Sequence, residues 1–315
     1  MQRIAPMLCK IGSKGDLKRK DYIFEPKLDG TRAICYFSKR RIDFVNRRFK
    51  NITYRYPEIV EELKKCLKAQ QAVLDGEIIV YDEQGLPDFN LLQKREQIEK
   101  PWIIRLRSQQ IPATYVVFDI LEKNNKSLIN LPLWERKKIL EKIIKPNKRV
   151  EIIFYTINGQ RLWKAVIKKN LEGVVAKPKN SFYFPNQRIA WLKIKYLKTV
   201  DCIIVGYTQE KRIISSLALA LYRNNDLIYI GRVGTGFASD FLKNLYALIK
   251  KKKLEVKKTL VANPPKVKIH WLKPELVAEI EYLELTTGNE LRAPSFKRLR
   301  IDKPPKDCLW ESSFS

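Results

Sequence analysis

Lys27 stands in a segment whose residue types could support nucleophilic chemistry. The segment reads Glu25-Pro26-Lys27-Leu28-Asp29-Gly30-Thr31-Arg32, so an acidic residue, a glycine turn and an arginine surround the lysine. A free lysine has a pKa of ~10.4 and is neutral in about one molecule in a thousand near pH 7, so a nucleophilic lysine needs surroundings that deprotonate it. Nearby cations favour this, because they disfavour the charged amine. The alternative interpretation is an ordinary turn at a strand end with a solvated lysine.

Four further short segments follow in order, and each sets charged or aromatic side chains in or beside an apolar strand. An inward Glu77 needs a partner to offset its desolvation. Lys193 and Lys195 fall on one face of a strand because side chains repeat every second residue, and two cations on one face can clamp a phosphate. The segments are Asp75-Gly76-Glu77, Val116-Val117-Phe118-Asp119, Glu172-Gly173-Val174-Val175-Ala176-Lys177 and Trp191-Leu192-Lys193-Ile194-Lys195.

Each of these segments also has a purely structural interpretation. Phe118 would be a core residue in most strands of this kind. Glu77 and Glu172 could be half-buried partners of structural arginines, and residues 191–195 could form a solvated edge strand. The joint occurrence of all five segments in a fixed order favours the functional interpretation.

The charge balance indicates a polyanionic partner. The chain carries 62 Lys+Arg against 34 Asp+Glu, a net charge of +28. Such an excess attracts polyanions. The alternative is a lysine-rich composition typical of an AT-rich genome.

Cysteine and histidine usage argues against a zinc site or a disulfide framework. The 5 cysteines are scattered without a Cys-x-x-Cys pair, and His270 is the only histidine.

No run approaches the ~18 consecutive apolar residues of a membrane span, and the first residues lack the apolar core of a signal peptide. We therefore expect a cytoplasmic protein with no membrane partner.

The first part of the chain has a mixed α+β pattern. Short apolar runs at residues 34–36, 73–81, 115–121 and 173–177 predict strands. A helix is expected to begin at Pro57, which suits a first helical position, and to bury Ile59, Leu63, Cys66 and Leu67. Two more helices are predicted at residues 133–144 and 162–169.

The pattern changes near Leu197, where we place a domain boundary that separates residues 1–197 from residues 198–315. Strands are predicted at residues 201–207, 216–222, 227–233 and 276–283, with a hairpin turn at residues 223–226 and a helix at residues 239–252. Several short strands with one helix predict an OB-type barrel, a fold often used on nucleic acid.

The five segments, in this order, resemble the nucleotidyltransferase superfamily of ATP-dependent DNA ligases, NAD-dependent ligases, RNA ligases and mRNA capping enzymes. The second half is similar to the ligase domain of bacterial ligase D, the end-joining enzyme. The segments that carry this likeness are residues 231–237, 271–277 and 291–303. The resemblance implies an adenylyltransferase domain (an ATP-grasp-like nucleotidyltransferase) followed by a C-terminal OB-fold domain.

The resemblance also implies a role for each site residue. Lys27 would form the phosphoramidate with AMP, and Glu172 would hold Mg²⁺ or Mn²⁺. Before Trp191 the family commonly has Gly-Arg-Ser, where this chain has Gln187-Arg188-Ile189-Ala190, so Arg188 receives no role. By this resemblance, Glu25 with its neighbouring backbone would recognise adenine, Phe118 would stack on it, and Glu77 would bind the ribose. Arg32 and Arg47 would contact sugar and phosphate, Lys177 would face the nucleotide, and Lys193 and Lys195 would bind the α-phosphate. Arg300 and Lys303 would belong to a mobile C-terminal motif.

The implied activity is ATP-dependent sealing of a nick in double-stranded DNA, by a monomer, in DNA repair or end joining. A DNA end-binding protein is a candidate partner. Two alternatives remain at this point. One is an RNA ligase or capping-type nucleotidyltransferase, and the other is a basic DNA-binding or scaffolding protein with an inactive nucleotidyl site.

Overall fold

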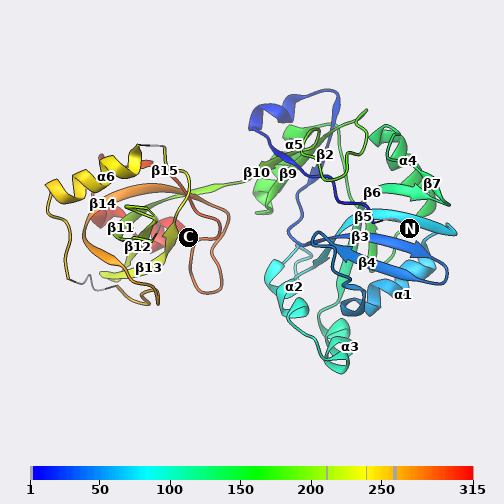
Figure 1. Ribbon diagram of the computed structural model, residues 1–315, viewed down its shortest axis with the longest axis horizontal. Coiled ribbons are helices and arrows are strands. Elements are labelled where there is room, and N and C mark those ends of the chain that lie inside the picture. The colour runs from blue at the N-terminus through cyan, green and yellow to red at the C-terminus, as the bar shows by residue number, and fades with distance from the viewer. Residues whose placement is uncertain (1–2, 211, 239, 258–260, 315) are drawn as a thin grey trace. The chain divides into compact units, whose positions relative to one another are not determined.

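The computed structural model describes residues 3–210, 212–238, 240–257 and 261–314. The chain divides into two compact units, Met1–Tyr196 and Leu197–Ser315 (Figure 1). The described residues contain no helix with the length and apolar character needed to cross a membrane.

A six-stranded sheet forms one layer of the first unit, in the order β4-β3-β5-β6-β7 with β8 parallel beside β6. Both of its faces are covered, because successive residues of β3 enter two different cores. Ala33 and Cys35 belong to one core and Ile34 and Tyr36 to the other. The strands are β3 (Thr31–Ser38), β4 (Ile42–Asn46), β5 (Gln71–Val80), β6 (Ala113–Lys123), β7 (Lys126–Ser127) and β8 (Val150–Ile152).

A four-stranded sheet forms a second layer, in the order β1-β10-β9-β2. It packs against α5, whose Leu162 and Val166 share a core with Phe24 and Val174 of the sheet. The elements are β1 (Lys10–Ile11), η1 (Lys14–Lys18), β2 (Tyr22–Pro26), α5 (Gly159–Lys168), β9 (Gly173–Pro178) and β10 (Leu192–Lys195).

Helices cover the outer face of the six-stranded sheet. Ile59 and Leu63 of α1, Leu92 of α2 and Leu140 of α4 lie in one buried cluster with β3, β5 and β6. The helical elements are η2 (Thr53–Arg55), α1 (Pro57–Cys66), α2 (Phe89–Glu96), α3 (Pro101–Gln110) and α4 (Leu133–Ile143).

The second unit is an antiparallel sheet in the order β13-β12-β11-β14-β15. It curls, because the amides of Leu291 and Phe296 donate to the carbonyls of Ile230 and Thr235, 2.8 and 2.9 Å away, across the two outer strands. This is the predicted OB-type architecture. The elements are β11 (Lys198–Thr208), β12 (Ser216–Arg223), β13 (Asp226–Val233), α6 (Phe241–Lys251), β14 (His270–Tyr282), β15 (Ser295–Leu299), η3 (Pro305–Asp307) and α7 (Trp310–Phe314).

The predicted α+β class and OB-type barrel are confirmed, as are the helix that begins at Pro57 and the hairpin between β12 and β13. Asn224 and Asn225 turn that hairpin with φ of 49° and 68°, as a type I′ turn requires.

Three predicted boundaries were wrong or fall outside the described residues. α5 begins at Gly159 rather than residue 162, because the Asn158 side chain accepts from the Arg161 amide, 2.9 Å away, and caps the helix. β14 begins at His270 rather than residue 276, since a register shift lets the chain pass Pro274 without its missing N–H. The predicted start of the helix of the second unit, Ser239, lies outside the described residues, and α6 begins at Phe241.

Candidate functional site

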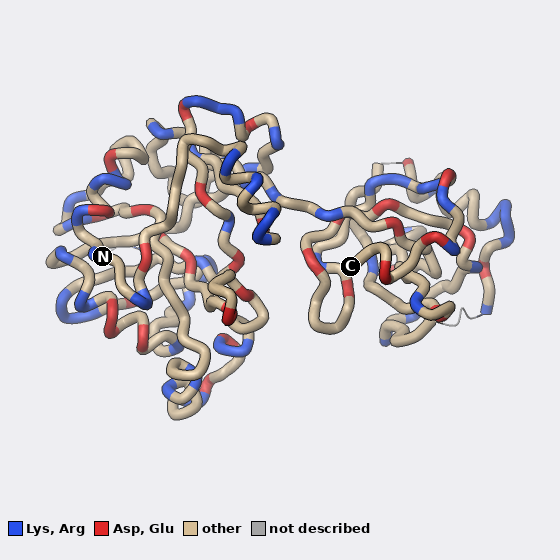
Figure 2. Tube along the Cα trace, turned by 180° about the vertical axis from the view of Figure 1, so that it is seen from behind, with Lys and Arg blue, Asp and Glu red and all other residues tan. Residues whose placement is uncertain are grey.

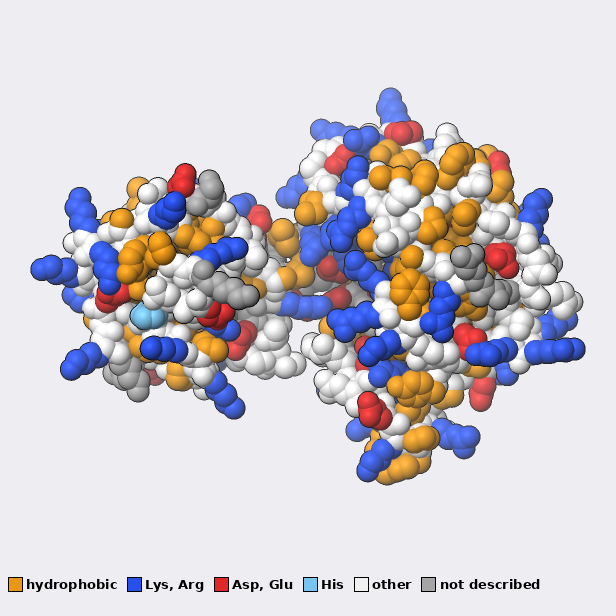
Figure 3. Space-filling view, in the orientation of Figure 1, with side chains coloured by type: hydrophobic (Ala, Val, Ile, Leu, Met, Phe, Trp, Pro, Cys, Tyr) orange, Lys and Arg blue, Asp and Glu red, His pale blue; other side chains and the backbone are white. Residues whose placement is uncertain are grey.

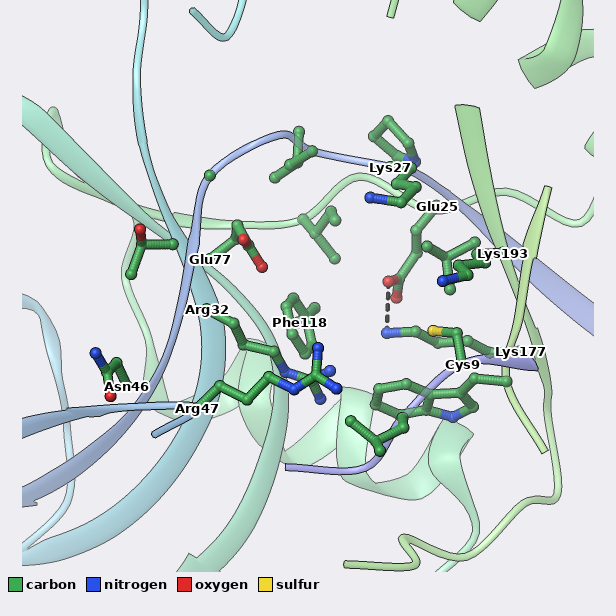
Figure 4. A pocket seen from close by; sticks show the side chains of 18 of the residues that line it. Cys9, Glu25, Lys27, Arg32, Asn46, Arg47, Glu77, Phe118, Lys177 and Lys193 are labelled. Atoms are coloured by element: carbon green, nitrogen blue, oxygen red, sulfur yellow. Dashed lines mark ion pairs between the residues drawn. The ribbon is translucent and has the colours of Figure 1, made fainter. Parts of the chain in front are cut away.

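A cavity of about 580 Å³ in the first unit is lined by residues from both sheets (Figure 4). Its volume is in the range of small-molecule sites. Eight of the predicted site residues line it: Glu25, Lys27, Arg32, Arg47, Glu77, Phe118, Lys177 and Lys193.

Lys27 and Glu172 meet because β2 and β9 are antiparallel neighbours. The Lys27 amide donates to the Gly173 carbonyl, 2.9 Å away, just past the end of β2. The Lys27 ammonium forms an ion pair with the Glu172 carboxylate. Gly173 is needed here, since it has φ of +148° and a Cβ would lie 2.2 Å from the Ile194 carbonyl oxygen. Backbone pairing therefore brings a candidate nucleophile to a carboxylate.

The glycine that follows Lys27 permits close packing of the turn. A Cβ at Gly30 would lie 2.4 Å from the Ile78 carbonyl oxygen of β5. The chain then enters β3, where Arg32 stands directly opposite Glu77. The motif Lys-x-Asp-Gly thus sets Lys27 and Arg32 at one cavity wall.

Arg32 is held by a fully buried carboxylate that the sequence analysis left without a role. Its Nε and Nη2 donate to Asp75, 3.0 and 2.6 Å away, and the Tyr183 hydroxyl donates to the same carboxylate at 2.7 Å. The guanidinium carbon lies 5.1 Å from the centroid of the Phe118 ring. Asp75 and Tyr183 therefore fix Arg32 beside the aromatic wall of the cavity.

Glu77 is a half-buried acid without a direct ion pair among the described contacts. Burial raises the pKa of Glu77 to about 8, and the positive charges of Arg32 and Lys27 only partly oppose this shift. A carboxyl that keeps its proton near neutral pH can both donate and accept hydrogen bonds, so Glu77 can pair with a hydroxyl group.

Glu25 lies in the cavity wall with both carboxylate oxygens engaged. Oε2 forms an ion pair with Lys177, 2.6 Å away, and Oε1 forms an ion pair with Lys137 of α4. The Lys177 nitrogen also lies 4.4 Å from the Phe118 ring centroid and 4.0 Å from that of Trp191. This wall combines one cation, Lys177, with one carboxylate and two aromatic faces, and Lys137 lies behind it.

Further basic side chains line the cavity, and Lys193 lies on the same sheet as Glu25, since both stand beside Val175 of β9. Burial and the neighbouring charge of Lys195 lower the pKa of Lys193, which lines the cavity. Lys195 is not among the described lining residues, although it lies on the same strand opposite Gly173. Arg188, to which no role was assigned, lines the cavity together with Arg47. These cations can bind the negative charge of phosphate groups.

Arg300 and Lys303 lie in the second unit and pair there with Asp201. The Arg300 Nη1 and the Lys303 Nζ lie 2.8 and 3.1 Å from the same Asp201 oxygen. Arg300 also pairs with Asp302 at 2.8 Å. These two predicted site residues thus share one carboxylate partner within their own unit.

Glu172 is not among the described lining residues of the cavity but pairs with Lys27, which is, and it fits a magnesium ion together with a phosphate ligand. No group of three or more metal-binding side chains occurs in the described ranges, with residues 1–2, 211, 239, 258–260 and 315 aside. Mg²⁺ is commonly bound by one or two carboxylates, substrate phosphates and water. Glu172, a single carboxylate beside basic side chains, fits that donor set.

Two buried cations behind the cavity were not predicted from the sequence. Arg136 and Lys137 of α4 are buried, where Arg136 pairs with Asp119 at 2.8 Å and Lys137 with Glu25. A signal was present, because both cations occupy the helix face that also carries Leu133 and Leu140. Charged residues at apolar positions of an amphipathic helix require buried partners.

Comparison with known proteins gives matches over nearly the whole chain. The family described as "ATP dependent DNA ligase domain" matches residues 6–195, and "ATP dependent DNA ligase C terminal region" matches residues 210–303. The multifunctional non-homologous end joining protein LigD of Mycolicibacterium smegmatis is 33% identical over 98% of this chain and 40% of that protein. DNA ligase 2 of Methanosarcina mazei is 31% identical over 92% of this chain and 53% of that protein.

Solved structures agree with these matches. The ligase domain of M. tuberculosis LigD is 28% identical, covers 97% of this chain and 98% of its own, and has a TM-score of 0.54. A mycobacterial DNA ligase D complexed with ATP and MES is also 28% identical with the same coverage, and has a TM-score of 0.55. The chain spans about half or less of the length of the two curated relatives named above.

Proposed function

Because this chain belongs to the family of ATP-dependent DNA ligases, we propose that it seals nicks in double-stranded DNA through AMP carried on Lys27. The observation that carries the proposal is the cavity that Lys27, paired with Glu172, lines together with the aromatic rings of Phe118 and Trp191 and several basic side chains. These are the parts needed to bind a nucleotide and to attack its α-phosphate.

The first step forms a bond between the Lys27 nitrogen and the α-phosphorus as the bond to pyrophosphate breaks. Phe118 would stack on adenine, Glu77 would bind the ribose, and Arg32 with Arg47 would contact sugar and phosphate. Lys193 and Lys195 would stabilise the charge that develops on the α-phosphate, and Lys177 would face the nucleotide. Mg²⁺ or Mn²⁺ bound at Glu172 would neutralise phosphate charge when present.

The next two steps use DNA. AMP moves from Lys27 to the 5′-phosphate of the nick, and the 3′-hydroxyl then attacks that phosphate and expels AMP. In this scheme residues 1–197 are the adenylyltransferase domain and residues 198–315 the OB-fold domain. Arg300 and Lys303 would leave Asp201 to orient the β- and γ-phosphates during the first step.

The basic surface supports a nucleic-acid substrate. Lys and Arg residues are spread along the trace of both units (Figure 2), and their side chains are spread over the visible face of each unit (Figure 3). The net charge of +28 favours binding of the DNA backbone through release of its counterions.

The proposed setting is the cytoplasm, where ATP and chromosomal DNA meet. We assign the enzyme to DNA repair or end joining as a monomer, with a DNA end-binding protein as its candidate partner. The name of the M. smegmatis relative, a non-homologous end joining protein, supports this assignment.

The test is self-adenylation with α-labelled ATP and Mg²⁺. Wild type should acquire label that is stable to alkali and labile to acid and to hydroxylamine, Lys27→Ala should acquire none, and the control Lys39→Ala, at an exposed lysine, should label normally. Label on Lys27→Ala would refute the assignment of the nucleophile. An unlabelled wild type that still binds DNA would favour an inactive scaffold, and labelling by GTP or better sealing of nicked RNA would favour a capping enzyme or an RNA ligase.

A further inference from the structure

The Glu25 carboxylate is sealed between two lysines, only one of which reaches the cavity. The side chains of Glu25, Lys137 and Lys177 are 2%, 1% and 2% exposed. Lys177 lines the cavity, whereas Lys137 is not among the described lining residues and approaches Glu25 from behind, on α4. Lys137 therefore acts on the cavity only through Glu25.

Stability alone does not account for this cluster. Moving an ammonium and a carboxylate out of water costs several kcal/mol per ion, and a well-packed apolar pair is often at least as stable. Burial lowers the pKa of Lys137, and the charge of Glu25 opposes that shift. A buried charge cluster in the wall of a binding cavity is consequently a candidate for a functional role.

The position of α4 does not depend on Lys137. The neighbouring Arg136 donates to both oxygens of Asp119 at 2.8 Å and to the carbonyls of Leu131 and Ser181 at 2.6 and 3.1 Å. Asp119 directly follows Phe118 on β6. Arg136 thus anchors α4 to β6, the strand that carries Phe118. The contact of Lys137 with Glu25 is not needed for that anchoring.

We propose that Lys137 is a positioning residue for purine selection: it holds the Glu25 carboxylate in the orientation that accepts a hydrogen bond from the exocyclic amine of adenine. This inference rests on the proposed use of ATP. A carboxylate has about four acceptor sites, so acceptor capacity remains when each oxygen is paired with one lysine. Adenine offers an amino donor where guanine offers a carbonyl acceptor, and a carboxylate repels the latter.

Without Lys137 the carboxylate would lose one of its two fixed contacts. Glu25 could then turn so that both oxygens approach Lys177, which would withdraw the acceptor from the base and neutralise the only cation left in the cluster. The amine of adenine would lose its partner, whereas a purine without that amine would lose nothing. The expected consequence is a loss of base selectivity rather than a general loss of chemistry.

The experiment compares self-adenylation of the full chain by ATP and by purine riboside triphosphate, which lacks the 6-amino group. In wild type, kcat/KM should favour ATP by about tenfold or more, as expected for one charge-assisted hydrogen bond. Lys137→Met should raise the KM for ATP until that preference falls to about threefold or less, with kcat/KM for the analogue nearly unchanged. Lys137→Arg should restore most of the preference.

The matched control is Lys138→Met, which removes the same side chain at the neighbouring, exposed position of α4 and should keep the wild-type ratio. Equal losses for ATP and the analogue in Lys137→Met, or an unchanged ratio, would overturn the inference and leave Lys137 a structural residue. Lys137→Gln carries the same test if the methionine variant does not fold. A wild type that labels with neither nucleotide would instead refute the proposed function.

Discussion

The raised pKa of Glu77 makes the stability of the first unit depend on pH in a way that one substitution should remove. Burial raises this pKa from the ordinary 4.5 to about 8. Between those values the folded protein keeps the Glu77 proton and the unfolded chain releases it. The unfolded state therefore binds fewer protons, and the free energy of unfolding must fall as pH rises through this window.

Glu77→Gln keeps the shape of a neutral carboxyl but cannot titrate. For one titrating group, each pH unit between 4.5 and about 8 changes the free energy of unfolding by at most about 1.4 kcal/mol. The stability of Glu77→Gln relative to wild type should therefore increase by roughly 2–3 kcal/mol from pH 5.5 to pH 7.5, with the sign always in favour of glutamine at the higher pH.

The assay is urea unfolding without nucleotide at a series of pH values. The transition of the first unit is identified as the one that ATP shifts to higher urea concentration, because a ligand stabilises only the unit that binds it. Glu83→Gln, at an exposed acid, is the control and should follow wild type at every pH. A difference between wild type and Glu77→Gln that does not change with pH would refute the assignment of a buried, protonated Glu77.

Three other predictions follow from the site and the charge. Phe118→Ala should weaken ATP binding by roughly 1–3 kcal/mol through lost stacking, and an unchanged KM for ATP would make Phe118 a core residue only. The logarithm of nick affinity should fall linearly with that of salt, at about −0.9 per phosphate neutralised, whereas a flat response would argue against electrostatic binding. Arg300→Ala and Lys303→Ala should impair labelling by ATP but spare the sealing of a pre-adenylated nick. Asp201→Asn, which releases both cations, should lower the KM for ATP. Normal labelling with failed sealing in the two alanine variants would contradict the roles given to Arg300 and Lys303.

Periodicity and turn chemistry predicted much of the fold because both are local. The hairpin at Asn224 and Asn225 and the helix that begins at Pro57 are written in consecutive residues. α2 and α3 were not predicted, because a local pattern identifies a helix only where the sequence carries an apolar stripe. In α3 only Ile104 is fully buried while Trp102 and Leu106 are 67% and 46% exposed, so its sequence lacks the apolar stripe that identifies a helix.

The site was predicted as residue types but not as contacts. The ordered segments identified Lys27 and Glu172, and the antiparallel strands bring them together across 145 positions of sequence. The partner of Glu25 could not be deduced in this way, because Lys137 lies 112 positions away on a helix whose lysine-rich sequence resembles a solvated face. Which of two adjacent lysines is buried depends on the packing of α4 against the sheets, and Lys138 is the exposed one.

Burial separates the ion pairs that the proposed reaction must break from those that it must keep. The side chains of Lys27 and Glu172 are 22% and 13% exposed, so water and an incoming phosphate can replace each partner at modest cost. The side chains of Glu25 and Lys137 are 2% and 1% exposed, and separating them would leave the Lys137 charge without its carboxylate in a medium that solvates it poorly. The lysine proposed as the nucleophile therefore belongs to the half-buried pair. The carboxylate proposed to hold a fixed orientation toward the base, Glu25, belongs to the buried pair. Substitution of Lys137 should therefore alter the choice of nucleotide, whereas substitution of the neighbouring, exposed Lys138 should not.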